Sequence, residues 1–375
     1  MTRHIPPAAD ELEISIIGPG RGECVLLHLG NNAWCIIDSC IGRDSQEPVA
    51  LEYLKTLNND VLQGVRLVIA SHWHDDHIRG LARTLKETPN ASFACSSALQ
   101  SEHFQKLVSI ADVPILGSSG VTEFNSIYDV ILERQTQGRP RELVTPLYAV
   151  QNRRLLFLPA PGRPFPVSVI ALSPSDLTHT LALQQIAQLL PQVGDRPRRI
   201  IPQDPNHTSV AIWVEAGPRN ILLGADLTHT GRAGEGWMAV VESHQQENTA
   251  GIFKVPHHGS DNGDYPGIWA SLLTPNPVAV VTPFTAKVRL PRQSDLDRLS
   301  AATTNLYCTS EGAGKPPARD SSVERVIRSM GVDRQVVEGK AGHVRVRWSM
   351  TDVQAEPVVE LFNGAYRVPH LKMAS

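Results

Sequence analysis

The sequence has no long apolar run. No stretch of its 375 residues approaches the roughly eighteen consecutive apolar residues that a membrane-spanning helix needs. The first ten residues lack the apolar core of a secretory signal peptide. No internal repeat or low-complexity tract is present. These absences predict a soluble, cytosolic protein with no membrane partner.

The sequence also has little net charge and few cysteines. A formal net charge of −3 provides no overall basic surface for nucleic acid, although a local basic groove stays possible. The cysteines are odd in number and scattered, which excludes a disulfide framework: Cys24, Cys35, Cys40, Cys95 and Cys308. Cys35 and Cys40 are close enough to suggest a metal site, but we expect them to pack in the core, as free cysteines commonly do.

What the sequence does have is a dense cluster of metal-binding side chains. Residues 72–77 read His-Trp-His-Asp-Asp-His and directly follow the apolar run 65–70. Imidazole nitrogens and carboxylate oxygens are donors that suit zinc, manganese or iron. Chance is a poor explanation, because only 14 histidines are spread over the whole chain. The cluster therefore predicts a metal site rather than a polar loop.

The spacing within this cluster predicts two divalent ions, with zinc as the first choice and manganese as the alternative. Side chains two apart in an extended segment point the same way, so His72 and His74 can bind one ion. Asp76 and His77 lie a turn further on and can face a second ion.

This motif, placed after a buried strand, resembles the signature of the metallo-β-lactamase superfamily, and other segments resemble the remaining motifs in the expected order. The resemblance implies that Asp38 supports the metal-binding loop without binding metal itself. It also implies that His207 is the third histidine of the first metal site, that Asp226 bridges the two ions, and that His257 completes the second site.

Within that superfamily, segments 206–210 and 254–260 resemble the hydrolase domain of ComEC/Rec2-type competence proteins. The resemblance covers roughly residues 11 to 310. In that subgroup the position of His207 is often not a histidine. Its presence here favours full occupancy of the first metal site.

Two adjacent histidines compete for the last ligand position. Neighbouring residues at the end of a strand point to opposite sides, so only one of His257 and His258 should reach the second ion. We take His257, because it comes first after the expected strand 252–255. His258 is then left to position the substrate or to protonate the leaving oxygen. Ser260 is a candidate donor to the substrate.

Alternating strand-like and helix-like segments predict a mixed α/β fold, the αββα sandwich that the resemblance also implies. With 41% hydrophobic residues, a chain of this length can bury a large core. We expect strands at 11–17, 23–29, 33–38, 65–70, 147–158, 167–172, 210–214, 219–223, 252–255 and 278–282, and helices at 48–57, 98–110, 122–137, 234–245 and 265–273. The loop ends of both sheets should then meet at one edge, where the motifs converge.

The expected domain organisation is a hydrolase domain over residues 1–310, with an insert at about 84–204, followed by a C-terminal extension over 311–375. The extension begins as a linker and contains a small β element near 343–348. The glycine-rich segment 18–22 lacks the Lys-Ser/Thr of a nucleotide-binding loop, so we expect a hairpin loop near the mouth of the site.

The insert carries arginines in three groups, at 139–141, 153–154 and 196–199. Guanidinium groups bind phosphates bidentately, which makes Arg198 and Arg199 candidate substrate contacts. A solvated surface loop is the more ordinary explanation for arginines that alternate with proline.

The expected chemistry is hydrolysis. Two ions about 3.5–4 Å apart would generate a bridging hydroxide near neutral pH and stabilise charge on the attacked oxygen. Asp76, Asp226 and His258 are the residues expected to take part in catalysis. The resemblance implies a nuclease or phosphodiesterase acting on nucleic acid or another phosphodiester.

Two other functions stay open. The same chemistry suits a small ester, a lactone or a cyclic nucleotide. A non-catalytic partner subunit that retains the fold is the third possibility. In any of these cases, the insert and the C-terminal extension are candidate surfaces for a protein partner.

Overall fold

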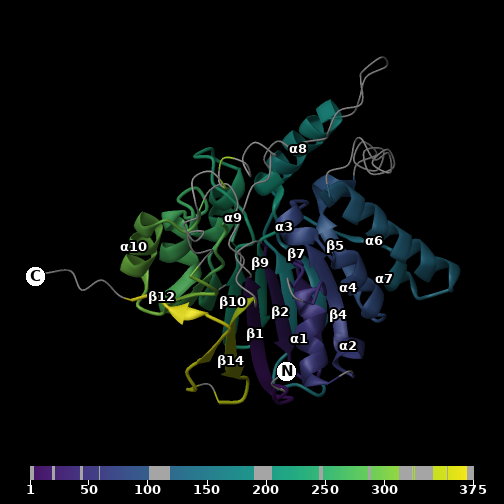
Figure 1. Cartoon of the computed structure of the whole chain (residues 1–375), viewed down its shortest axis with the longest axis horizontal. Helices are drawn as coiled ribbons and strands as arrows, with labels where there is room; N and C mark the ends of the chain where they lie inside the picture. Colours follow the sequence, from purple (N-terminus) through teal and green to yellow (C-terminus); the bar gives the residue numbers. More distant parts are fainter. Residues whose placement is uncertain are drawn as a thin grey trace, which may run out of the picture.

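The chain forms two eight-stranded sheets that pack face to face, with helices on both outer faces (Figure 1). The computed structural model describes residues 4–18, 22–42, 45–58, 60–100, 119–189, 205–244, 248–285, 289–311, 323, 325, 341–352 and 354–369. No helix within these ranges is long and apolar enough to cross a membrane. The mixed α/β sandwich expected from the sequence is confirmed.

The first sheet combines an antiparallel meander with a parallel part. In spatial order it contains β15 (Val358–Phe362), β14 (Gly342–Ser349), β1 (Glu11–Gly18), β2 (Cys24–Leu29), β3 (Trp34–Ile37), β4 (Val65–Ala70), β5 (Ser92–Ser96) and β6 (Leu147–Ala149). Strands β3 to β6 run parallel. The carboxyl ends of these four strands therefore lie at one edge of the sheet.

The second sheet is built in the same way. In spatial order it contains β16 (Tyr366–Arg367), β13 (Leu306–Cys308), β12 (Leu273–Val281), β11 (Ala250–Lys254), β10 (Arg219–Leu223), β9 (Ile212–Ala216), β8 (Val167–Ala171) and β7 (Arg153–Leu158). Strands β10 to β13 run parallel, so their carboxyl ends share an edge. The candidate site is assembled from these two parallel parts.

Both faces of each sheet are buried, which explains why the strands are nearly continuous apolar runs. In β4, Leu67 and Ile69 pack against the other sheet, while Val68 and Ala70 pack against the outer helices. This alternation follows from the two-residue period of a strand. All five cysteines are free and buried, and Cys35 and Cys40 pack in these layers as expected.

The outer faces are covered by amphipathic helices. The first sheet is covered by α1 (Val49–Leu57), α4 (Leu81–Glu87), α6 (Ser119–Thr136) and α8 (Asp176–Leu189), and the second by α9 (Gly236–Ser243), η4 (Ile268–Leu272) and α10 (Gln293–Ala302). Helix α1 follows Pro48, as the sequence predicted, and ends at Asn58. Its buried residues include Leu54 and Leu57, which pack in the core between the helices and the first sheet.

The segment expected as an insert belongs to the sandwich itself. Strands β5 and β6 extend the first sheet, and β7 and β8 extend the second. The chain therefore passes from one sheet to the other between β6 and β7, within the segment 147–158 that was expected as strand, and β6 and β7 do not form a hairpin. The helix expected at 122–137 is α6. The helix expected at 98–110 lies almost wholly outside the described residues, which here end with η1 (Ser97–Gln100).

The C-terminal strands also join the two sheets. Strand β14 pairs with β1 over its whole length, from Glu11 opposite Ser349 to Gly18 opposite Gly342. Strand β15 lies beside β14, and β16 pairs with β13 in the other sheet. The predicted β element is thus part of the sandwich. The domain boundary at residue 310 stays a prediction.

Candidate metal centre

The cluster at residues 72–77 lies at the carboxyl end of β4 and runs into the one-turn helix α3 (Asp75–Ile78). The rings of His72 and His77 are fully buried, and their centroids lie 4.3 Å apart. His72 Nε2 lies 3.1 Å from His74 Nδ1. Burial, with His77 and His74 nearby, holds the pKa of His72 well below its ordinary value. The ring is therefore neutral, the form in which imidazole binds metal.

Asp38 supports this loop from the neighbouring strand. It follows β3 in a left-handed conformation, with φ of 60°. Its Oδ1 accepts a hydrogen bond from the Ser71 backbone N–H at 2.7 Å, and its Oδ2 accepts one from the Ser71 hydroxyl at 2.6 Å. His77 Nδ1 lies 2.8 Å from Asp38 Oδ2. This contact fixes the His77 ring with its other nitrogen turned toward the second sheet.

Asp226 brings a carboxylate from the second sheet. It follows β10 and is 2% exposed. Its Oδ2 lies 3.3 Å from His77 Nε2 and 3.5 Å from His258 Nε2. The carboxylate therefore stands between a histidine of the first sheet and a histidine of the second.

Of the two adjacent histidines, His258 faces this carboxylate. Its Nε2 also lies 3.5 Å from Asp76 Oδ2, and its Nδ1 contacts the Thr282 carbonyl at 2.9 Å. His257 points elsewhere: its Nε2 contacts Asn206 at 3.1 Å, and it belongs to none of the donor groups found among the described residues. Of the two, His258 therefore lies next to the carboxylates of Asp76 and Asp226, where the sequence had led us to expect His257.

The reason is the backbone after β11. Both histidines adopt left-handed conformations, with φ of 45° for His257 and 54° for His258. They lie in the short helical turn η3 (His257–Gly259) and not in an extended strand end. The rule that alternate residues face alternate sides does not apply to such a turn, so their order along the chain could not decide between them.

The donor atoms form one continuous cluster. Groups whose donor atoms lie within 4.8 Å of one another are Asp38, His72 and His77; His72, His74 and Asp226; Asp76, His77 and His258; and Glu23, Asp226 and His258. Neighbouring groups share members, since His72, His77, Asp226 and His258 each occur in two of them. Glu23 was not singled out in the sequence, where it follows the glycine-rich segment without a recognisable motif.

The electrostatics of the cluster fit a cation. Burial acts to lower the pKa of His77, but nearby carboxylates, Asp226 first, hold it well above its ordinary value. Against the same effect of burial, Asp226 and Asp76 raise the pKa of His258 to about 10. Two buried atoms, His77 Nε2 and Asp226 Oδ1, have no hydrogen-bond partner among the described residues. A divalent ion would supply both the positive charge and the missing partner.

His207 is not brought into this cluster. It lies half-buried in η2 (Pro205–Thr208), and its Nδ1 is 3.0 Å from the Thr228 hydroxyl. It lines a different cavity of about 310 Å³, which also includes Arg232 and Glu235. None of the donor groups drawn from the described residues contains His207. Its expected role in the first metal site stays a prediction.

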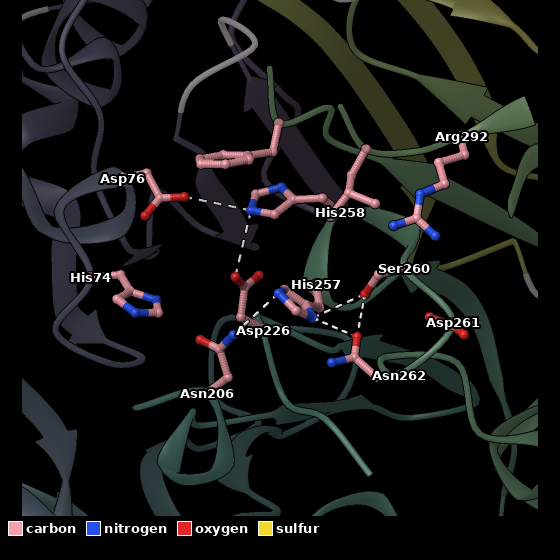
Figure 2. A pocket seen from close by; sticks show the side chains of 12 residues that line it. His74, Asp76, Asn206, Asp226, His257, His258, Ser260, Asp261, Asn262 and Arg292 are labelled. Atoms are coloured by element: carbon pink, nitrogen blue, oxygen red, sulfur yellow. Dashed lines mark hydrogen bonds and ion pairs between the residues drawn. The ribbon is translucent and has the colours of Figure 1, made fainter. Parts of the chain in front are cut away.

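A cavity of about 520 Å³ opens above the cluster (Figure 2). Its lining residues are His74, Asp76, Asn206, Asp226, His257, His258, Ser260, Asp261, Asn262, Phe284, Leu290 and Arg292. Figure 2 shows Asp76, His258 and Asp226 linked along one side. On the other side His257 is linked to Asn206, Ser260 and Asn262.

Of the residues predicted to contact the substrate, one lines the cavity. Ser260 is part of its wall, and its role as a donor to the substrate stays a prediction. Arg198 and Arg199 lie outside the described residues. Arg139 donates to the Pro89 carbonyl and Arg153 to the Tyr148 carbonyl, so both serve local structure. The cavity instead has Arg292, which looks in the sequence like any surface arginine before a helix.

Comparison with known proteins gives fold similarity only. No protein-family model matches the sequence, and no curated protein matches it. Similar solved structures include the metallo-β-lactamase fold protein YhfI from Bacillus subtilis, with 12% identity and a TM-score of 0.32 over 65% of this chain and 70% of that one. Metallo-β-lactamase SMB-1 in complex with mercaptoacetic acid has 14% identity and a TM-score of 0.35, over 65% and 76% of the two chains. Zn(2+)-bound PqqB from Methylobacterium extorquens has 11% identity and a TM-score of 0.30, over 62% and 58%.

Similarity at this level carries no information about substrate, and none of these three proteins is described as a competence protein. The assignment of the fold rests on the two facing sheets, their outer helices and the edge at which the metal-binding side chains meet. That architecture is the αββα sandwich expected from the sequence.

Proposed function

We propose that the protein is a metal-dependent hydrolase that uses two divalent ions, with zinc as the first choice. The observation that carries this proposal is the position of the donor cluster at one side of a cavity large enough for a small ligand. A purely structural ion would be enclosed by protein ligands, whereas a catalytic ion keeps access to substrate.

The proposed ligands follow the donor groups. His72, His74 and Asp226 would hold one ion. Asp76, His77 and His258 would hold the other, with the carboxylate of Asp226 shared between the two. His258 takes the place that the sequence gave to His257, and His207 is left out.

When bound, the ions would supply an activated water and stabilise negative charge on the attacked oxygen. The protein's own residues would provide orientation. Asp38 fixes the His77 ring, and Phe284 stacks on His258 with ring centroids 5.1 Å apart, which shields one face of that ring. Asn262 and Ser260 hold His257 at 2.8 and 2.9 Å. These contacts keep the metal-facing and cavity-facing histidines in fixed orientations.

For the substrate we propose a phosphodiester, with nucleic acid as the first choice. Arg292 supplies a guanidinium to the cavity wall, where it could bind a phosphate. The resemblance of segments 206–210 and 254–260 to ComEC/Rec2-type hydrolase domains supports the same choice. The cavity volume lies in the small-ligand range of about 300–1,000 Å³. We therefore expect a single-stranded end or a small phosphodiester to enter more readily than an uninterrupted duplex.

A second candidate is a small ester, lactone or cyclic nucleotide. The apolar side chains of Phe284 and Leu290 on the cavity wall favour it, because they would bury an uncharged part of such a molecule. The third possibility, a non-catalytic subunit, is disfavoured by the complete donor cluster. A cytosolic location and a protein partner that binds residues 84–204 or the C-terminal extension stay predictions.

A substrate panel with and without chelator tests the proposal. Bis-p-nitrophenyl phosphate, single-stranded and duplex nucleic acid, a neutral p-nitrophenyl ester and a lactone would be compared on protein loaded with zinc or manganese. Chelator-sensitive cleavage of a phosphodiester, lost in Asp226→Asn, is the expected result. Turnover of the ester or lactone alone would establish the second candidate. No turnover of any compound by fully loaded protein would favour the non-catalytic subunit.

A further inference from the structure

A buried ion pair lies directly behind the metal-facing side chains. Lys254, the last residue of β11, and Glu23, just before β2, are 0% and 1% exposed. Lys254 Nζ lies 2.6 Å from Glu23 Oε1. The pair therefore joins the second sheet to the first. Burying two charges costs free energy that their attraction often only just offsets, so a pair at this depth calls for an explanation other than stability.

The lysine also holds the turn that carries Asp226. Its Nζ donates to the Ala225 carbonyl at 2.8 Å, and the backbone N–H of His257 donates to the same carbonyl at 2.9 Å. Ala225 adopts a left-handed conformation, with φ of 43°, which is unfavourable for a residue with a side chain. Lys254 thus ties together the two strained turns that precede Asp226 and His258.

The same ammonium group faces the back of the Asp226 carboxylate. Lys254 Nζ lies 4.0 Å from Asp226 Oδ1, the oxygen that has no hydrogen-bond partner among the described residues. Oδ2 of the same carboxylate points toward His77 and His258. The Lys254 ammonium group thus lies near Oδ1, and His77 and His258 lie near Oδ2. These contacts on opposite oxygens define the orientation of the Asp226 carboxylate.

Glu23 also contacts the segment that carries Asp76 and, through Thr282, the ring of His258. Its backbone N–H donates to the Asp76 carbonyl at 3.1 Å. Its Oε2 accepts a hydrogen bond from the Thr282 hydroxyl, and the carbonyl of Thr282 contacts His258 Nδ1 at 2.9 Å. Through these contacts one buried pair touches the segments that carry Asp76, Asp226 and His258.

We propose that Lys254 and Glu23 are positioning residues for the metal centre: together they fix the orientation of Asp226 and His258 and thereby set the affinity of the site for divalent metal. Neither residue is a ligand in this proposal. It is independent of the substrate, because it concerns the protein's affinity for zinc and not turnover.

The direction in which zinc affinity changes when Lys254 is removed distinguishes a positioning role from simple charge repulsion. A positive charge 4.0 Å from a metal-binding carboxylate weakens cation binding by repulsion, so its removal alone would tighten binding. If Lys254 positions Asp226, its removal weakens binding instead. For Lys254→Met we expect about 10–100-fold weaker zinc binding, the size typical of residues that orient metal ligands.

The same variants also test whether Glu23 is itself a metal ligand. Glu23 lies close enough to Asp226 and His258 to serve as a ligand itself. If it did, Lys254→Met would free the carboxylate and leave zinc binding unchanged or tighter, while Glu23→Gln alone would weaken it. If the pair acts as a unit, both single variants weaken binding to a similar extent.

The experiment measures zinc affinity by competition with a chromogenic chelator, the visible spectrum of the cobalt(II)-loaded protein, and the melting temperature of the metal-free protein. The variants are Lys254→Met, Glu23→Gln and the double variant Glu23→Gln/Lys254→Met. Glu13→Gln is the matched control. Glu13 is another fully buried carboxylate of the first sheet, paired with Arg347, and it belongs to none of the donor groups among the described residues.

The main prediction is that the double variant recovers its melting temperature but not its affinity for zinc. Each single variant should melt at a lower temperature, because it leaves one buried charge unpaired, and the double variant should recover most of that loss. Zinc affinity and the cobalt spectrum should stay altered in the double variant. Glu13→Gln should lower the melting temperature without changing either metal readout.

Two results would overturn the proposal. One is zinc binding in Lys254→Met that equals or exceeds that of the wild type. The other is a double variant that recovers affinity together with stability, which would reduce the pair to a structural contact. If a single variant does not fold, Thr282→Val supplies the test, since it removes only the hydroxyl bonded to Glu23. Zinc affinity unchanged by that substitution would count against the proposal.

Discussion

The two halves of the sandwich contribute to the candidate metal centre in different ways. The first half supplies most of its metal-facing side chains from one six-residue segment after β4. The second half supplies Asp226 and His258 from two separate turns, after β10 and after β11. The first contribution is local in the sequence, and the second exists only when the sheet has formed.

The backbone reflects the same difference. The first half has one left-handed residue at the site, Asp38, whose carboxylate is held by Ser71 and His77. The second half has three, namely Ala225, His257 and His258. Left-handed residues other than glycine persist only where surrounding contacts impose them. We therefore expect changes in the second half to disturb the centre more than changes in the supporting contacts of the first.

The cavity makes the comparison sharper. Of its lining residues only His74 and Asp76 come from the first half, whereas the second half supplies its amide, apolar and guanidinium groups. In the proposed function, the first half would therefore supply metal ligands, and the second half would supply metal ligands together with the groups that contact the substrate. The following predictions test this difference between the halves.

The largest effect is expected for Asp226→Asn. The substitution removes the negative charge that lies between His77 and His258, so the two halves should no longer share an ion. Bound metal should fall by about one ion per chain, and activity should fall to the background of the assay. Elemental analysis and turnover check this. Two ions retained with substantial activity would mean that Asp226 does not bridge the halves.

The next largest effect is expected for His258→Ala, with His257→Ala as its matched neighbour. His258 faces the carboxylates, so its removal should cost about one ion per chain. His257 contacts Asn206 and Asn262 at the cavity wall, so its removal should leave the metal content intact and reduce turnover. Metal analysis of both variants decides between them. Loss of metal only in His257→Ala would restore the assignment made from the sequence.

A smaller effect is expected for Asp38→Ala in the first half. The carboxylate orients His77 without belonging to the shared part of the centre, so we expect about a 10–100-fold loss of metal affinity or activity. Asp75→Ala is the control. Asp75 is exposed on α3, the short helix that carries His77, and it is in none of the donor groups among the described residues. If Asp38→Ala had as large an effect as Asp226→Asn, the supporting contacts of the first half would matter as much as the shared carboxylate of the second half.

The smallest effect is expected for Arg292→Gln on the cavity wall. Losing one guanidinium contact to an anionic substrate should raise KM several-fold and leave metal content unchanged, as is usual for a residue that only binds substrate. Arg289→Gln is the control, because Arg289 is exposed and does not line the cavity. Equal KM values for both variants and the wild type would remove Arg292 from the proposed substrate site.

The fold class could be predicted from the amino-acid sequence alone, and so could the donor segment that the first half brings to the candidate site. Apolar runs with turn signals marked most strands, because the central strands of each sheet, such as β3, β4 and β10, are buried on both faces and are mostly apolar. The segment 72–77 could be recognised because its side chains are neighbours along the chain, so that their chemistry is visible before folding. The same holds for Asp38, which ends the third apolar run.

The second half of the candidate centre and its surroundings could not be predicted in this way. The position of His258 beside the carboxylates goes with left-handed backbone angles at His257 and His258, and the His257 N–H is bonded to the distant Ala225 carbonyl; no local pattern encodes these features. Glu23 and Lys254 are 231 positions apart in the numbering, yet they form one ion pair, because the two sheets bring their strand ends to a common edge. Nor could the placement of Arg292 at the cavity, or of His207 away from the cluster, be read from residue type. Such contacts between distant segments arise only from the packing of one sheet on the other.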